Sequence, residues 1–192
     1  MNAISRTVVY PRFEGARNTA LSFSSPPTDN AFAISQKKTH FSTNFYTIEM
    51  VVEFKAIRSA QIFSLVKNPN YSDQSFIFSL SGTSGFFTFA TGKNTIITTT
   101  SQPVFPFRSY HIVIVKGRKV GDNNVFLYIN SVLVFSFFAG FPETISYDNY
   151  VLIGRGATML FDDLAIYDRE LTVTEIQNHY NTLRKILEFI QN

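Results

Sequence analysis

The sequence predicts an all-β fold, an antiparallel β-sandwich of jelly-roll type with one helix at the C-terminus. The first observation is a series of short β-forming runs separated by Gly, Pro, Asn and Ser residues. The second is strict alternation over residues 45–54, where every second side chain is apolar, as in a strand with one buried face. The third is that strand runs never alternate with helical segments, which argues against a parallel α/β fold.

The remaining strands follow from similar runs between turn signals. They are predicted at residues 20–23, 31–35, 61–66, 75–80, 86–90, 95–100, 110–115, 125–129, 132–138, 150–153 and 160–167. Asn130 and Ser131 separate two of these runs by two residues, which favours a tight hairpin. The run at 132–138 is apolar on both faces, so we expect a helix, a loop or another protein to cover its outer side.

The C-terminal segment predicts a helix that begins at a capping box. Thr172 and Glu175 have the spacing at which each side chain can bind the other's backbone N–H. An apolar stripe of helical period follows, formed by Ile176, Tyr180, Leu183, Leu187 and Ile190. We expect the stripe to lie on the sandwich as far as Leu183. Beyond it, Leu187 and Ile190 are predicted to contact a partner chain.

The length, charge and cysteine count of the chain exclude several classes of function. The chain has 192 residues, enough for one well-filled domain, and only 16% of them are charged. The net charge of +3 comes from scattered residues, so nucleic acid is not the expected partner. Cysteine is absent, which removes disulfides and thiolate chemistry. No membrane span is predicted, and the first residues lack the apolar region of a signal peptide.

Several stretches, taken in order, resemble a known family. They are residues 20–23, 30–34, 45–52, 110–115, 125–130, 152–154, 161–171 and 174–177. Among them, 45–52 reads FYTIEMVV, 125–130 reads VFLYIN and 161–171 reads FDDLAIYDREL. This series is similar to laminin-G-like domains of the concanavalin A-like lectin/glucanase superfamily. The resemblance implies a concanavalin A-like sandwich and a function in recognition.

The resemblance divides the chain into three parts and has two departures. A laminin-G-like β-sandwich is expected at 19–183, between an N-terminal arm at 1–18 and a C-terminal helical extension at 184–192. Tyr110 stands where the family has Trp, and Ser131 stands where it has the hairpin Gly. The chain contains no Trp, so glycan stacking would depend on Tyr and Phe. Tyr71, Phe107, Tyr147 and Tyr150 are the predicted ligand-binding aromatics.

Two glutamates raise the question of catalysis. Glucanases of this superfamily carry a Glu-x-Asp-x-Glu motif on one strand, and here Glu49 and Glu53 flank Val51 where the Asp would be. Residues four apart on a strand are separated by about 13 Å at Cα, far for a retaining pair. We interpret the two glutamates as a solvated face, and the chain as no enzyme. The alternative is a β-glucan hydrolase.

Asp29, Asn30, Asp162 and Asp163 are the candidate metal ligands, because Ca²⁺ binds carboxylate and carbonyl oxygens. The alternative is that the aspartates cap turns and pair with Arg155 or Arg169, and no other cofactor is expected. Of the histidines, His111 lies in an apolar strand, where a hydrogen-bonded structural role is the usual one.

These observations together predict a non-catalytic recognition or assembly module. The leading hypothesis is a structural subunit of a larger complex, such as a virion or its capsid, that contacts protein neighbours. The second is a lectin-like module that binds a carbohydrate.

Overall fold

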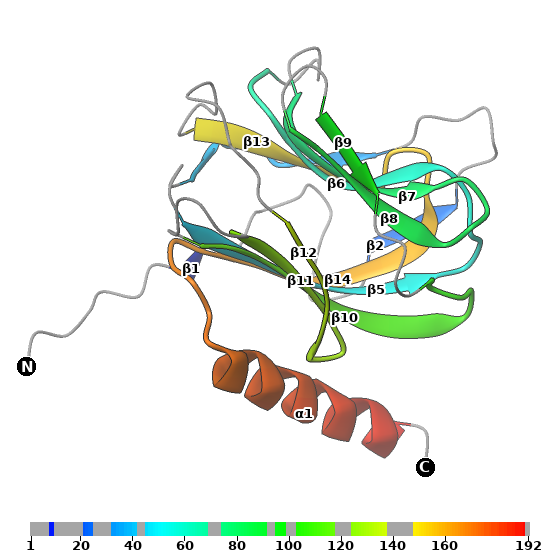
Figure 1. Cartoon of the computed structure of the whole chain (residues 1–192). Helices are drawn as coiled ribbons and strands as arrows, with labels where there is room; N and C mark the ends of the chain where they lie inside the picture. Colours follow the sequence, from blue (N-terminus) through cyan, green and yellow to red (C-terminus); the bar gives the residue numbers. More distant parts are fainter. Residues whose placement is uncertain are drawn as a thin grey trace, which may run out of the picture.

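Two antiparallel β-sheets face each other across an apolar core, and one helix lies outside them (Figure 1). This computed structural model describes residues 8–9, 21–24, 32–41, 45–68, 74–91, 95–98, 103–117, 124–137 and 148–190. For residues 8–9, 24, 91, 95–98 and 185–190 only the backbone is described.

The sheet nearer the helix is called the helix-side sheet. Its strands, in spatial order, are β1 (Val8–Val9), β14 (Thr158–Tyr167), β5 (Tyr46–Phe54), β10 (Arg108–Lys116), β11 (Val125–Ile129) and β12 (Val132–Phe137), with β2 (Leu21–Ser24) also paired to β14. The opposite sheet consists of β3 (Ala33–Ile34), β13 (Asp148–Ile153), β6 (Ala60–Val66), β7 (Gln74–Ser81), β8 (Phe86–Thr91) and β9 (Thr95–Thr98), with β4 (Thr39–His40) also paired to β13.

The predicted sandwich and its C-terminal helix are confirmed, and most predicted strands agree with the structure to within about two residues. Two short strands, β1 and β4, were not predicted. β1 falls within the segment expected to be an N-terminal arm, yet it pairs with β14 with Val8 opposite Tyr167. A two-residue strand is too short to show a period, so the sequence pattern could not reveal it.

The core forms because alternate side chains of each strand point between the sheets. On β5 the inward residues are fully buried, and they are the apolar set of the predicted alternation: Tyr46, Ile48, Met50, Val52 and Phe54. The opposite sheet contributes a layer of buried aromatic rings from β7 and β8, formed by Phe76, Phe78, Phe87 and Phe89. Phe78 stacks on Phe87 with 4.8 Å between ring centroids.

The hairpin between β11 and β12 has the geometry that its sequence predicted. Asn130 and Ser131 both have positive φ, 51° and 65°, as a two-residue hairpin turn of type I′ requires. The expectation that the following apolar strand is covered is wrong at its start, because Val132 and Leu133 are exposed. Among the described strands β12 is the last of the helix-side sheet, and its first residues pair with β11 on one side.

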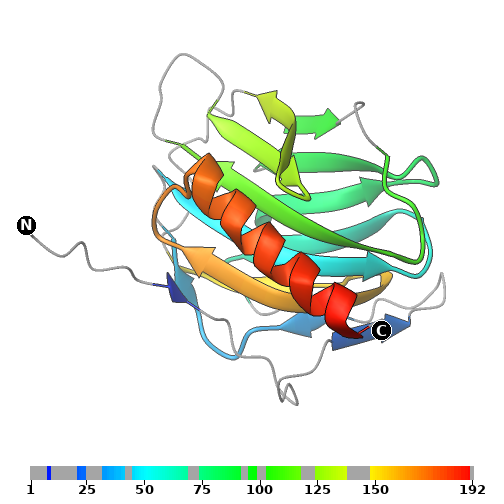
Figure 2. The ribbon, with the colours of Figure 1, turned by 90° about the horizontal axis from the view of Figure 1, so that it is seen from below.

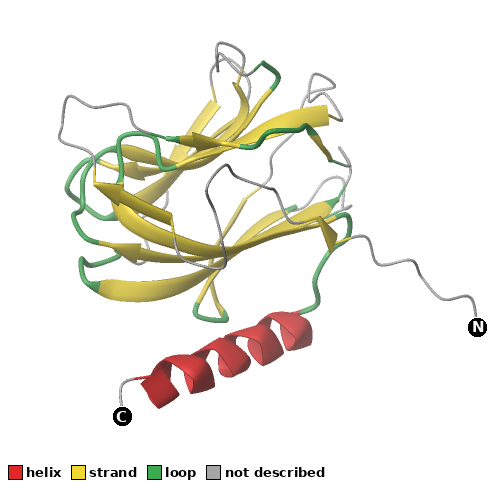
Figure 3. Cartoon of the chain, turned by 180° about the vertical axis from the view of Figure 1, so that it is seen from behind, coloured by secondary structure: helices red, strands yellow, loops and turns green. Residues whose placement is uncertain are grey.

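Helix α1 (Val173–Ile190) crosses the outer face of the helix-side sheet over β14, β5 and β10 (Figure 2). Figure 3 shows the helix as a separate layer outside the two sheets. Leu171 and Ile176 are buried against Val113, Val115 and Tyr128 of the sheet's outer face. The predicted packing of the helix on the sandwich is therefore confirmed for its first half. The side chains of Leu187 and Ile190, predicted to contact a partner, lie outside the described residues.

The predicted capping box begins the helix. Glu175 N–H donates to Thr172 Oγ1 at 3.2 Å, and Thr172 N–H donates to Glu175 Oε2 at 2.9 Å. Arg169 adds two hydrogen bonds to the same carboxylate, at 3.0 and 2.8 Å. These contacts, above all those of Arg169, lower the pKa of Glu175 to about 2. The carboxylate therefore stays ionised and holds the strand-to-helix connection.

Replacing the cap should weaken the fold by a modest, measurable amount. We expect Thr172→Ala to lower the free energy of unfolding by about 1 kcal/mol, because it leaves a helix N–H without its acceptor. Urea unfolding followed by circular dichroism measures the change. Thr174→Ala is the matched control, since Thr174 is exposed in the same turn. If Thr174→Ala costs as much as Thr172→Ala, the cap is not the cause.

Candidate functional site

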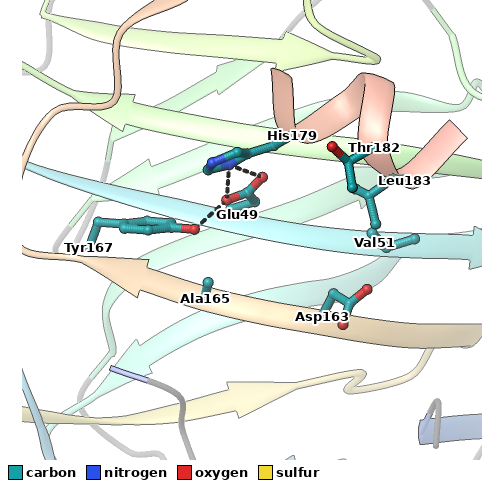
Figure 4. A pocket seen from close by; sticks show the side chains of 8 residues that line it. All are labelled: Glu49, Val51, Asp163, Ala165, Tyr167, His179, Thr182 and Leu183. Carbon is teal, nitrogen blue, oxygen red and sulfur yellow. Dashed lines mark hydrogen bonds and ion pairs between the residues drawn. The ribbon is translucent and has the colours of Figure 1, made fainter. Parts of the chain in front are cut away.

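A β-bulge in β14 shapes the outer face of the helix-side sheet beneath α1. Asp162 pairs with Val51 and Ala165 pairs with Glu49, so two residues of β14 lie opposite one residue of β5. Asp163, inside the bulge, has a φ of 49°, which is uncommon for any residue except Gly, Asn and Asp. Bulges often redirect side chains beside functional sites, and this one turns Asp163 towards the space under the helix (Figure 4).

Glu49 is the centre of a buried polar cluster on the same face. His111 Nε2 lies 2.6 Å from Glu49 Oε1, and Tyr167 donates its hydroxyl to Glu49 Oε2 at 2.8 Å. His179 of α1 places Nδ1 at 3.0 and 3.1 Å from the two oxygens. Tyr180, the next helix residue, stacks its ring on the His111 ring at 6.0 Å. One carboxylate therefore joins β5, β10, β14 and the helix.

The prediction that Glu49 lies on a solvated face is wrong. The period-two pattern placed Glu49 on the correct outer face, but the helix covers that face here. Burial raises the pKa of the Glu49 carboxyl. Hydrogen bonds from His111 and Tyr167, with the charges of His111 and His179, outweigh that effect and lower the pKa below its ordinary value of 4.5. The carboxylate is therefore ionised at neutral pH.

His111 lies in the sheet and is hydrogen-bonded, as predicted, but only one of its two ring nitrogens has a hydrogen bond to a described residue. Its Nε2 faces Glu49, whereas its buried Nδ1 has no hydrogen-bond partner among the described residues.

Acid should weaken the fold through Glu49. The ionised form is favoured in the folded state, so its contribution is complete above pH 4.5 and is lost as the pH falls through the lower folded value. We expect the urea midpoint of the wild-type protein to fall steeply with acidification below pH 4.5, and that of Glu49→Gln to fall less. Equal slopes in the two proteins would contradict this assignment.

The cluster forms one side of an open pocket of about 330 Å³ between the sheet and α1. Its lining mixes polar and apolar side chains, with Glu49, Tyr167 and His179 at one end and Asp163 and Thr182 at the other (Figure 4). The apolar residues of the lining are Val51, Ala165 and Leu183. The volume is at the small end of ligand-binding pockets.

Asp163 is the carboxylate of the pocket that remains available for a ligand. Its side chain has no hydrogen bond or ion pair among the described residues, whereas three donors hold Glu49. Burial, and then the neighbouring charges of Asp162 and Glu49, raise the pKa of Asp163. A ligand group that donates hydrogen bonds would relieve both effects.

The predicted ligand-binding aromatics do not line this pocket. Phe107 is exposed beside Lys55, at the end of β5, whereas Tyr150 pairs with Val66 at the far end of β6. Because residues 55–59 join the end of β5 to the start of β6, Phe107 and Tyr150 lie at opposite ends of the sandwich. Tyr71 and Tyr147 lie outside the described residues.

The predicted metal ligands are only partly described. Asp162 and Asp163 are exposed in the bulge, while Asp29 and Asn30 lie outside the described residues. Within the described ranges, no group of three or more His, Asp and Glu side chains is arranged to hold a metal ion. The Arg169 guanidinium, an alternative partner of these aspartates, binds Glu175 instead.

The two glutamates of the catalytic alternative have separate surroundings. Glu53 forms an ion pair with Lys55 and lies near Ser109, whereas Glu49 belongs to the buried cluster. They share the outer face of β5, four residues apart, so their Cα atoms are separated by about 13 Å.

In the described part of the chain, no helix is both long and apolar enough to cross a membrane.

Sequence reasoning missed most of the pocket. His179, Thr182 and Leu183 belong to a helix whose position over the sheet is a tertiary property. The available signal was the spacing of His179 and Leu183, which are four residues apart and so share one helix face. That face also carries Ile176, which is buried on the sheet.

Comparison with known proteins agrees with the fold. The Limulus polyphemus SAP-like pentraxin has a TM-score of 0.67 and 16% identity, and the match covers 84% of this chain and 81% of the pentraxin. A botulinum neurotoxin type C structure has a TM-score of 0.64 and 13% identity, with 93% of this chain and 46% of the toxin chain covered. Its title attributes cell entry of the toxin to interaction with two ganglioside molecules.

A Trypanosoma rangeli sialidase in complex with sialic acid has a TM-score of 0.62 and 12% identity, with 90% of this chain and 29% of the sialidase covered. The chain thus spans less than half the length of the toxin and sialidase chains. At these identities the likeness concerns the fold alone. No curated protein sequence matches the chain significantly.

The family is shown by the sequence itself. The sequence model described as "Concanavalin A-like lectin/glucanases superfamily" matches residues 26–177, which is most of the chain and most of the sandwich. The match confirms the resemblance drawn from the strand motifs. The chain therefore belongs to the concanavalin A-like lectin/glucanases superfamily.

Proposed function

We propose that the chain is a non-catalytic recognition module that binds a neutral sugar residue of a glycan in the pocket under α1. The observation that carries this proposal is the position of Asp163. Its carboxylate faces the pocket from a bulge at a φ of 49°, without a partner among the described residues. β-bulges that redirect a side chain are over-represented next to functional sites, and this one directs a carboxylate at a pocket.

The pocket offers the two kinds of contact that a sugar ring uses. Asp163 can accept hydrogen bonds from adjacent hydroxyls, and Thr182 adds a hydroxyl oxygen. Val51, Ala165 and Leu183 provide an apolar surface for the C–H face of the ring. The small volume suits one sugar residue, with the rest of the glycan in solvent.

The charges of the pocket support a neutral sugar over an acidic one. Glu49 and Asp163 both line the pocket, and a sugar carboxylate would be repelled by them. The proposed ligand, a neutral sugar, therefore differs from the gangliosides and the sialic acid named in the titles of the structural neighbours.

Two features support a binding role over a catalytic one. Glu49 is ionised and already accepts three hydrogen bonds, so it is a poor proton donor. Glu53 is paired with Lys55 and does not line the pocket.

An array of neutral and sialylated glycans, followed by calorimetry with the best ligand, tests the proposal. We expect neutral glycans to bind and Asp163→Asn to weaken binding roughly tenfold or more, because a charge-assisted hydrogen bond is lost. Asp162→Asn is the matched control, since it changes the adjacent exposed carboxylate that does not line the pocket. Binding of sialylated glycans alone, or equal losses in both variants, would overturn the proposal.

An assembly role is the second candidate, and the exposed Val132 and Leu133 of the β11–β12 hairpin favour it. Exposed neighbouring apolar residues can form the centre of a contact with a protein neighbour. We expect the mass in solution to exceed that of one chain, and to fall to it in the Val132→Ser, Leu133→Ser variant. A monomeric wild-type protein would remove the support for self-assembly.

A further inference from the structure

An exposed loop at the start of β10 holds two phenylalanines in a fixed position. Pro106 precedes Phe107, whose φ is 58°, and this is the pattern of a type II turn with phenylalanine in the position that favours glycine. Phe107 N–H donates to Phe54 O at 2.7 Å. Phe105 N–H donates to the Tyr110 hydroxyl at 2.8 Å. The backbone N–H groups of both aromatic residues therefore hold the loop, one through a backbone carbonyl and one through a side-chain hydroxyl.

The residue before this pair anchors the loop in the core. Val104 is buried and its N–H donates to Gly85 O at 2.9 Å. A Cβ on Gly85 would lie only 2.4 Å from Val104 O, so the close approach requires glycine there. These contacts tie the loop to the body of the sandwich.

The rings of Phe105 and Phe107 lie at the surface, outside the apolar core. Phe107 is 72% exposed and Phe105 is 52% exposed, among the largest exposures of apolar side chains in the described residues. Holding a phenylalanine at positive φ with its ring in water costs free energy. A partner that buries the rings would offset this cost.

Each ring has a cation beside it. Lys55 Nζ lies 5.9 Å from the centroid of Phe107, and the Arg108 guanidinium carbon lies 5.5 Å from that of Phe105. Lys55 also pairs with Glu53, while Arg108 is exposed and has no ion pair among the described residues. Exposed rings with cations beside them match a partner that has an apolar interior and an anionic surface.

We infer that the loop of residues 103–108 inserts Phe105 and Phe107 into the interface of an anionic lipid membrane, with Arg108 and Lys55 at the headgroups. Aromatic rings are favoured at this depth, and cations near an anionic surface add to the binding. This site is separate from the pocket under α1 and does not depend on the proposed glycan binding.

The absence of Trp from the chain allows a direct test. Phe107→Trp introduces a single indole at the tip, and Val173→Trp introduces one at an equally accessible position, 50% exposed, at the start of α1. Each protein is mixed with vesicles of phosphatidylcholine, alone or with phosphatidylserine. We expect the emission of Phe107→Trp to shift to the blue with the mixed vesicles, and that of Val173→Trp to stay unchanged.

Sedimentation with the same vesicles tests the unlabelled protein. We expect Phe107→Gly to lower the partition coefficient roughly tenfold or more, because one ring is no longer buried. This variant should fold, since glycine adopts a φ of 58° readily. Arg108→Gln should reduce the preference for phosphatidylserine, and Asp163→Asn should bind vesicles as the wild type does.

Three results would overturn the inference. The first is no wild-type binding to either kind of vesicle. The second is an equal blue shift in both Trp variants. The third is a Phe107→Trp emission that responds to a soluble oligosaccharide but not to vesicles, which would make the loop a sugar-stacking surface.

Discussion

Replacing Glu49 with alanine is expected to lower the free energy of unfolding by about 3–5 kcal/mol, because it removes the charged acceptor at the centre of a buried hydrogen-bond network. The side chains of Glu49 and His111 are only 8% and 2% exposed. Without the carboxylate, His111, His179 and Tyr167 each lose an acceptor in or beside the interface of α1. Urea unfolding followed by circular dichroism measures the loss.

Glu53→Ala is the matched control for this change. Glu53 is on the same strand and the same outer face, but its ion pair with Lys55 is partly exposed to solvent. Such pairs contribute about 0–1 kcal/mol, so the control should be nearly neutral. Equal effects of Glu49→Ala and Glu53→Ala would show that the cluster does not hold the helix to the sheet.

Replacing Phe78 with alanine should have an effect of similar size on the core. Its ring is fully buried and lies 4.8 Å from the Phe87 ring and 5.0 Å from the Phe89 ring, measured between centroids. Removing it leaves a cavity in an aromatic layer that cannot close without moving two strands, and such changes cost about 3–5 kcal/mol. The midpoint of thermal unfolding should fall accordingly.

Phe105→Ala serves as the control for Phe78→Ala, because Phe105 is exposed at the end of the sandwich. A change at such a surface position is usually within about 0.5 kcal/mol. If the two variants melt at the same temperature, the aromatic layer between the sheets is not the stabilising core.

The sandwich could be predicted because its signals are local. Strand β5 shows period two, the β11–β12 hairpin has Asn130 and Ser131 at its turn, and the helix has its capping box at Thr172. Each of these signals lies within about ten residues of sequence. β1 and β4 were missed because two residues cannot show a period.

The pocket could not be predicted, because it depends on contacts far apart in the sequence. Glu49 lies 62 residues from His111 and 130 residues from His179, and their meeting requires the helix to dock. Alternation gave the face of β5 on which Glu49 lies, but it could not say what covers that face. The bulge at Asp163 leaves no pattern in the sequence, since any extra residue in a strand can form one.

The sequence identified Phe107 as a candidate residue but could not give its position relative to the other candidates. The sequence predicted it as a ligand-binding aromatic, and the structure places it in an exposed loop outside the pocket under α1. Whether it lies near Tyr150, another predicted ligand-binding aromatic, depends on which strand ends come together, and the two residues lie at opposite ends of the sandwich.

We propose the pocket under α1 as the site of recognition. Nuclear magnetic resonance of the backbone amides, recorded during a titration with the best neutral glycan, tests it most directly. We expect the largest shifts at Val51, Asp163, Ala165 and Thr182, with none in the opposite sheet. Shifts confined to the opposite sheet, or to the loop of residues 103–108, would contradict the account.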